Sequence, residues 1–236
     1  QEVSPVSEEN DLLKRLTRRR RRMVEERARV LNNLQADLQA VSPGLLGITG
    51  DAQNVWFLRF LTCTDDLEKL PRLHRSTLLK IRSVGKKYAD AIQSWQKRAH
   101  FSDEISYVGE MIQEDAGRIL ELRDKIRDLD DRIAQVADSS SEAVIMSSIP
   151  GFGPTSTAEL AGEVGTIERF DTEASLALYL GMASLDNSSG KKKGSKSSKM
   201  VNTRAKMAMM AAVDSHRKCV PESQRYYEKK RAEGKK

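Results

Sequence analysis

The sequence feature that most restricts the fold is an apolar repeat in the middle of the chain. At 1.5 Å per residue, a helix over residues 102–138 is about 55 Å long. Because one small core cannot cover that length, we expect its apolar seam to pack against a second long helix. Asp115 is the one charged residue on the seam, and nearly five heptads in register predict a coiled coil. The apolar residues alternate at spacings of three and four: Ile105, Val108, Ile112, Ile119, Leu122, Ile126, Leu129, Ile133 and Val136.

A second helical pattern near the start of the chain could cover this seam. Over residues 11–41 apolar side chains recur at helical spacings, until Ser-Pro-Gly at 42–44 ends the pattern. The seam can pack against this segment in an antiparallel pair, or against the same helix of a second copy. Because we expect the seam to be too long for intramolecular burial alone, we predict a homodimer or a higher homo-oligomer.

These patterns divide the chain into three parts and predict an all-α fold. Residues 1–10 are polar and read as a linker. Residues 11–141 form the coiled-coil and dimerisation region, with short helices at 45–101. Residues 142–236 form a small C-terminal helical domain. The predicted class is therefore a long antiparallel or dimeric coiled coil, followed by a helical domain with a helix-hairpin-helix-like motif.

Composition excludes several classes of protein. Charged residues make up 31% of the 236 residues, and the apolar runs are too short to span a membrane. No signal peptide opens the chain. Cys63 and Cys219 lie far apart without metal-ligand spacing, so we expect no metal site and no disulfide framework. We expect a cytoplasmic, nucleoid-associated protein that has no membrane partner.

The net charge of +6 hides an asymmetry that indicates a polyanionic partner. Residues 181–236 contain 15 Lys and Arg against 5 Asp and Glu, which is +10, and the remaining 180 residues sum to −4. A basic end on a slightly acidic body is typical of nucleic-acid binding. A solvated basic tail is the alternative.

The segment Ile149-Pro150-Gly151-Phe152-Gly153-Pro154 resembles the hairpin of a helix-hairpin-helix motif. Glycines allow a tight turn, and a proline suits the first position of the second helix. Free N–H groups at that helix start can bind a DNA phosphate without reading sequence. Gly151, Gly153 and Thr155 are therefore candidate DNA-binding residues, although an ordinary helical hairpin fits the same pattern.

A serine- and lysine-rich loop follows between residues 186 and 199. It holds no apolar residue, so we expect a flexible cationic loop that becomes ordered on a polyanion. A serine hydroxyl needs activation before it can attack, and neighbouring lysines could stabilise the charge on an attacked phosphate. From composition alone, several serines remain open as nucleophiles. The DNA-binding candidates here are Lys191, Lys192, Lys193, Lys196, Lys199 and, in the helix expected after Asn202, Arg204.

Five consecutive arginines lie within the first helical pattern: Arg18, Arg19, Arg20, Arg21 and Arg22. At about 100° per residue they go right round the helix. One interpretation is a solvated helical turn. The other is a set of contacts to RNA or DNA phosphates.

Five segments together resemble the "one-ten" family of insertion-sequence transposases, which combine a DEDD nuclease with a serine and are guided by a bridge RNA. The segments keep the order and spacing of the family across nearly the whole chain: residues 16–27 with 32–34, 148–155, 169–170 with 178–183, 188–191 and 226–231. The chain departs from the family at Val201, where a glycine often precedes the asparagine, and in a loop that has lysine and serine in place of more arginine.

The resemblance implies a function and a domain organisation. It implies an N-terminal RuvC-like domain whose four acidic residues bind Mg²⁺, then a dimerising coiled coil and a C-terminal transposase domain. The chain starts at Gln1, so we expect a fragment that lacks the nuclease domain and is inactive alone. Ser189 matches the serine that attacks DNA and forms a phosphoserine link, and Ser188 is its neighbour. The implied partners are DNA and a guide RNA.

Two other functions remain open from the residues themselves. One is a non-catalytic helix-hairpin-helix DNA-binding protein on a coiled-coil stalk, which would bind DNA without capturing it covalently. The other is a structural coiled-coil protein with a solvated basic tail, which would show no salt-dependent binding of nucleic acid.

Overall fold

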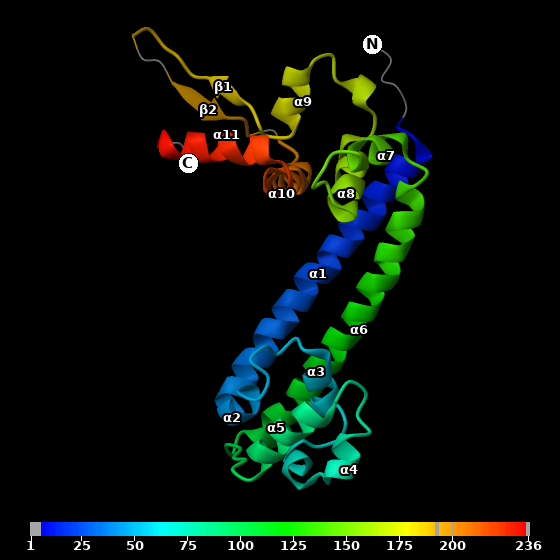
Figure 1. Ribbon diagram of the computed structural model, residues 1–236, viewed down its shortest axis with the longest axis vertical. Coiled ribbons are helices and arrows are strands. Elements are labelled where there is room, and N and C mark those ends of the chain that lie inside the picture. Colours follow the sequence, from blue (N-terminus) through cyan, green and yellow to red (C-terminus); the bar gives the residue numbers. More distant parts are fainter. Residues whose placement is uncertain (1–5, 192–193, 200, 235–236) are drawn as a thin grey trace. The chain divides into compact units, whose positions relative to one another are not determined.

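The computed structural model describes residues 6–191, 194–199 and 201–234, and it is almost entirely helical (Figure 1). The expected all-α class is confirmed, and the described residues add one two-stranded sheet. In chain order the elements are α1 (Glu8–Val41), α2 (Pro43–Leu46), α3 (Val55–Leu61), η1 (Leu67–Arg72), α4 (Arg75–Leu78), α5 (Lys86–Gln96), α6 (Ile105–Ala137), α7 (Ser141–Ser147), α8 (Pro154–Val164), η2 (Ile167–Arg169), α9 (Glu173–Tyr179), β1 (Ser184–Asp186), β2 (Ser195–Ser197), α10 (Thr203–Cys219) and α11 (Pro221–Ala232).

The chain folds as two compact units that share the two long helices. One unit is residues 21–127, and the other is residues 1–20 together with 128–236. This division differs from the sequence boundary at 141/142, because the start of α1 packs closely against α8. A Cβ atom on Gly162 of α8 would lie 2.5 Å from the backbone nitrogen of Lys14.

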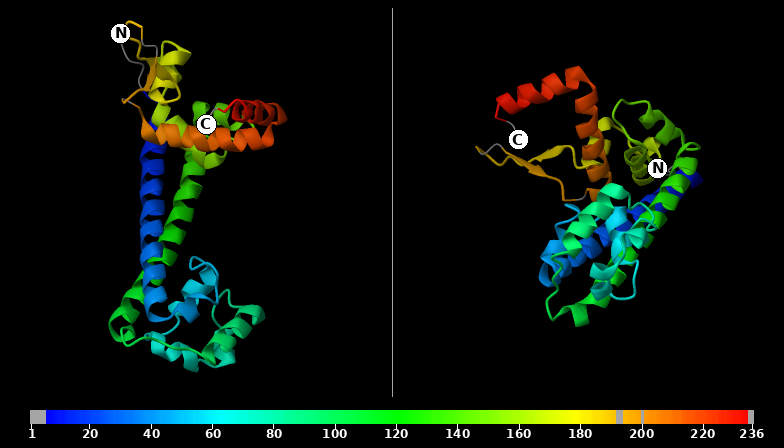
Figure 2. Two further views of the ribbon diagram at one scale, coloured as in Figure 1. Left: turned by 90° about the vertical axis from the view of Figure 1, so that its left-hand side faces the viewer. Right: turned by 60° about the horizontal axis from the view of Figure 1, so that its bottom comes forward.

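The unit of residues 21–127 has a large aromatic and aliphatic core. Phe57 and Phe60 of α3 are fully buried, and the Phe60 ring lies edge-on to Trp95 of α5. Parts of α1 and α6 complete this core and run beside each other in this unit (Figures 1 and 2). Glu26 of α1 accepts a hydrogen bond of 2.9 Å from Nε of Arg118 of α6.

The predicted long helix exists as α6, and a single chain buries its seam. Ile112, Ile119 and Leu122 are at most 1% exposed, and Ile126, Leu129 and Ile133 at most 7%. The expectation that one chain cannot bury this seam is therefore wrong, because α1 is as long as α6 and lies antiparallel to it within each unit. The seam supplies no argument for a second copy, so the homodimer stays a prediction without that support.

The unit containing the C-terminal part is built around α8. Leu160 and Val164 of α8 share a small core with Leu180 and with Ala205 and Ala208 of α10. Helices α7 and α8 pack against each other on either side of the turn at residues 148–153, and α10 lies across α8 and continues into α11 after a bend at Val220 (Figure 2). The two strands form an antiparallel hairpin between α9 and α10.

Candidate nucleic-acid interface

A buried carboxylate organises the C-terminal part of the chain. The Glu163 side chain is 1% exposed. Its two carboxylate oxygens accept hydrogen bonds from Nε and Nη2 of Arg18, at 2.7 and 2.8 Å. The second oxygen also accepts one of 2.7 Å from Nδ2 of Asn202. Burial works to raise the pKa of Glu163, but the hydrogen bonds from Arg18 and Asn202 outweigh it and hold the pKa below its ordinary value. The carboxylate therefore links α1, α8 and the start of α10.

Asn202 and Tyr179 close the base of the segment that carries the serines and lysines. The Asn202 backbone nitrogen donates to the Tyr179 carbonyl at 2.9 Å, and its Nδ2 contacts the Tyr179 hydroxyl oxygen at 2.7 Å. That hydroxyl donates to the Glu163 carbonyl at 2.7 Å. The Asn202 side-chain oxygen also caps α10 by accepting from two backbone N–H groups. Both ends of residues 180–201 are thus anchored to the domain core.

The anchored segment is a β-hairpin, whereas we expected a flexible loop. Ser184 pairs with Ser197, Leu185 with Lys196, and Asp186 with Ser195. All six strand residues are exposed, so apolar burial does not hold the strands together. Backbone hydrogen bonds between the strands hold them together, and the anchored ends of the segment keep the two strands close to each other.

The hairpin turn carries the predicted nucleophile. Ser189 is exposed and is followed by Gly190, whose φ is +58°. The neighbouring hydroxyl of Ser188 donates to Oδ1 of Asp186 at 2.7 Å. Among the described residues, no side chain hydrogen-bonds to Ser189. Within the described part of the chain, Ser188 thus has a carboxylate partner and Ser189 has none.

The candidate lysines surround these serines. Lys191, Lys196 and Lys199 are described and exposed on the hairpin, whereas Lys192 and Lys193 lie outside the described residues. Arg204 is exposed in the first turn of α10, next to the hairpin base. The hairpin therefore carries the predicted serine together with three of the predicted lysines.

In the segment 149–154, the glycine hairpin, one glycine is needed for packing within the domain. Gly151 has φ +86°, and a Cβ atom there would lie 2.5 Å from the His216 backbone nitrogen of α10. The Pro150 carbonyl contacts Nδ1 of His216 at 2.7 Å. Gly151 is thus required by close contact with α10. Gly153 has open space around it and caps α8 without a side-chain hydrogen bond, and Thr155 is half-buried in the first turn.

The five arginines of α1 do not act alike. Arg18 binds Glu163, and Arg20 forms an ion pair with Asp130 of α6. Arg21 also interacts within the chain. Arg19 and Arg22 are exposed, and neither forms an ion pair with another described residue. For Arg18 and Arg20 this favours a structural role, and it leaves Arg19 and Arg22 as the accessible cations of the turn.

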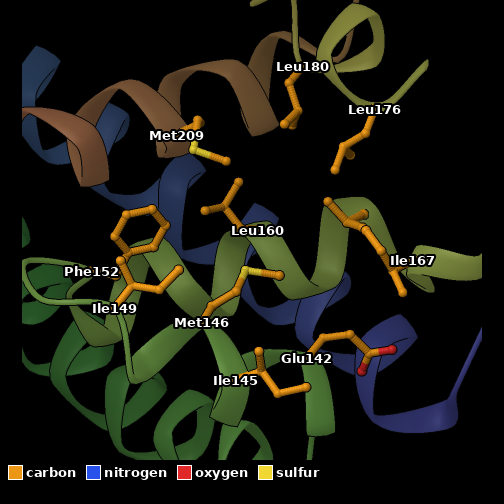
Figure 3. Close-up of a pocket in the computed structure, with 11 residues that line it drawn as sticks. Glu142, Ile145, Met146, Ile149, Phe152, Leu160, Ile167, Leu176, Leu180 and Met209 are labelled. Carbon is orange, nitrogen blue, oxygen red and sulfur yellow. The ribbon is translucent and has the colours of Figure 1, made fainter. Parts of the chain in front are cut away.

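An apolar pocket that no sequence motif indicates lies on the same domain. Its volume is about 300 Å³, and Figure 3 shows aliphatic side chains, two methionines and Phe152 around it. Glu142 lies at its edge and accepts a hydrogen bond of 2.7 Å from Nδ2 of Asn10. Because no cation lines the pocket, it does not suit a phosphate.

Over the described ranges, no three His, Cys, Asp or Glu side chains gather as a metal site. In the same part of the chain, no helix is both long and apolar enough to cross a membrane.

Part of the chain is similar to known proteins of insertion elements. Residues 143–228 match the model of the transposase IS116/IS110/IS902 family. A curated relative, an uncharacterized 44.8 kDa protein of the insertion element IS116 from Streptomyces clavuligerus, is 25% identical over 231 residues. That alignment covers 94% of this chain and 57% of the relative, so the chain spans little more than half the relative's length. No solved structure gives a significant match. The domain that carries the serine hairpin is therefore similar to insertion-sequence transposases.

Proposed function

We propose that this chain is part of an insertion-sequence transposase that binds DNA and a guide RNA and exchanges DNA strands through a serine nucleophile. The observation that carries the proposal is the β1–β2 hairpin. It presents serines and lysines on an exposed turn, its base is anchored by Asn202 and Tyr179, and it lies inside the region matched by the transposase family.

In the proposed reaction the Oγ atom of Ser189 attacks a backbone phosphorus. A bond forms between Oγ and phosphorus, one phosphorus–oxygen bond to a deoxyribose breaks, and the released oxygen leaves as a hydroxyl after taking up a proton. The serine proton passes to a base. Lys191 and Lys196 stabilise the charge that develops on the phosphate oxygens. Gly190, at φ +58°, lets the turn approach the DNA backbone closely.

The choice of Ser189 rests on the family resemblance, and Ser188 is its rival. The hydrogen bond from Ser188 to Asp186 supports that rival, because a carboxylate can orient a serine hydroxyl and accept its proton. Ser189 would need a base from elsewhere in the complex. The two serines therefore make different predictions about Asp186, which should matter only if Ser188 is the nucleophile.

Nucleic-acid binding in this proposal is electrostatic and independent of sequence. It is supported by the exposed Lys196 and Lys199 on the hairpin, Arg204 beside it, and Arg19 and Arg22 on α1. Among the described residues, no group of three or more His, Cys, Asp or Glu side chains could hold Mg²⁺.

The test uses the full transposase with its guide RNA and DNA substrates. Ser189→Ala should abolish recombination and covalent DNA capture, while DNA binding changes less than twofold. Ser147→Ala, at an exposed serine of α7 in the same domain, is the matched control and should recombine normally. If Ser188→Ala abolishes the reaction and Ser189→Ala does not, the assignment of the nucleophile is wrong. If wild type binds DNA but never captures it covalently, the protein is a non-catalytic DNA-binding protein.

A further inference from the structure

A groove of about 500 Å³ lies between α10 and α11. No described residue of the serine hairpin lines it, whereas its lining residue His216 contacts Pro150 beside Gly151. Its volume is in the range of small-ligand sites. Helix α10 contributes one wall and α11 the other. The lining residues that matter are His216 and Arg217 of α10, and Ser223, Tyr226, Tyr227 and Lys230 of α11.

Helix α11 carries two tyrosines whose rings are not part of a hydrophobic core. Of its twelve described residues none is buried, and Tyr226 and Tyr227 are 65% and 39% exposed. Polar contacts hold the helix in place. Nε2 of His216 contacts the Ser223 hydroxyl at 3.1 Å, and Arg217 donates to Gln224 at 3.3 Å. Since the tyrosines are not needed to bury α11, their position requires another explanation.

Cations lie against both rings. The Arg217 guanidinium is 4.2 Å from the centroid of the Tyr227 ring, so one face of that ring is already covered. The Lys230 ammonium is 5.6 Å from the centroid of Tyr226, whose ring is otherwise open to solvent. An aromatic face with a cation beside it can stack a planar base and attract the flanking phosphate.

Helix α11 as a whole is cationic, which favours an anionic partner. It carries Arg225, Lys229, Lys230 and Arg231 against Glu222 and Glu228. In the groove itself Arg217 is paired with Asp214 at 2.5 Å and Lys230 with Glu233 at 2.8 Å, so a bound phosphate would share these cations with carboxylates. In a duplex the base faces are covered by their neighbours, so a ring such as Tyr226 can stack only on an unpaired base.

We propose that the α10–α11 groove binds an unpaired nucleotide of single-stranded DNA or RNA, with the base stacked on Tyr226 and the adjacent phosphate beside Lys230. This inference rests on the proposed function, because it assumes that the chain works on nucleic acid. It adds a site that holds a displaced or unpaired strand within the domain that carries the serine hairpin.

The experiment measures binding of the 236-residue chain to fluorescent 12-nucleotide oligo(dT), oligo(U) and a 12-base-pair DNA duplex. Tyr226→Ala should weaken binding to one or both single strands by roughly 10- to 100-fold and binding to the duplex by less than twofold. Tyr226→Trp should restore the affinity. Tyr107→Ala, which removes a tyrosine 83% exposed on α6, is the matched control and should have no effect. The relative loss for oligo(dT) and oligo(U) identifies whether DNA or RNA is held.

Salt dependence separates stacking from simple charge. Tyr226→Ala should leave the slope of log K against log salt unchanged, whereas Lys230→Gln should reduce it by about one unit. Equal losses for single strands and duplex, or no loss at all, would overturn the inference and leave the proposed function standing. If light scattering shows that Tyr226→Ala has a different molecular mass in solution from wild type, the inference is overturned too. Tyr226 would then lie in an interface between two copies of the protein. If wild type binds none of the three probes, the proposed function itself fails.

Discussion

Gly162 lies where the backbones of α8 and α1 meet most closely, and its replacement by alanine tests that packing. The added methyl group would stand 2.5 Å from the backbone nitrogen of Lys14, 2.8 Å from its Cα and 2.9 Å from the carbonyl carbon of Leu13. Non-bonded carbon atoms normally approach to about 3.5–4.0 Å, so the two helices would have to separate by roughly 1 Å.

The magnitude follows from two opposing effects. Overpacking costs about 1–3 kcal/mol, and the upper end applies here because helix backbone, and not a flexible side chain, must move. Alanine in place of glycine within a helix returns about 1 kcal/mol. The net destabilisation is therefore about 2 kcal/mol, which lowers the Tm by roughly 4–8 °C in a chain of this size.

The measurement is thermal unfolding followed by circular dichroism, with Gly117→Ala as the matched control. Gly117 lies inside α6, and a Cβ atom there would have nothing within 4 Å. This control should raise the Tm by roughly 2–4 °C through helix propensity alone. If Gly162→Ala is as stable as wild type, the close contact between α1 and α8 is not rigid and the reasoning fails.

Two further predictions concern charge. The pKa of Glu163 is held below the ordinary glutamate value of 4.5, so its ionised form stabilises the fold above that pH, and this stabilisation is lost as the pH falls through the lower pKa. Glu163→Gln should therefore cost about 2 kcal/mol of unfolding free energy in urea at pH 7, and the difference from wild type should shrink as the pH falls below 4.5. A gap that stays constant with pH would contradict the ion pair. Changing Lys191, Lys196 and Lys199 together to glutamine should reduce the salt slope of DNA binding by about three units in a filter-binding titration. An unchanged slope would show that the hairpin does not touch phosphates.

The position of the long helix could be predicted because helical periodicity is a local property of the sequence. The heptads predicted a helix over roughly 103–137, and α6 spans Ile105–Ala137. What failed was the inference that this seam is too long for one chain to bury. The first helix, α1, is 34 residues long and α6 is 33, so the two match in length.

The polar centre of the C-terminal part could not be predicted, because its members are far apart in sequence. Glu163 follows an ordinary Ala-Gly pair and reads as a surface charge, while its partner Arg18 lies 145 positions away. His216 carries no motif that indicates its contact with Pro150. Similarly, β1 and β2 are made of serine, lysine and aspartate with a single leucine, residues that by themselves indicate a loop.

The central claim, that a hairpin serine becomes covalently joined to DNA, is tested most directly by locating the bond. The full transposase is incubated with guide RNA and a DNA substrate, the covalent complex is isolated under denaturing conditions and digested with nuclease and protease, and the modified peptide is sequenced by mass spectrometry. The account predicts a nucleotide or phosphate on Ser189. A modification on Ser188 would transfer the role to the serine that bonds Asp186, and a covalent complex with no modified residue between 184 and 199 would contradict the account.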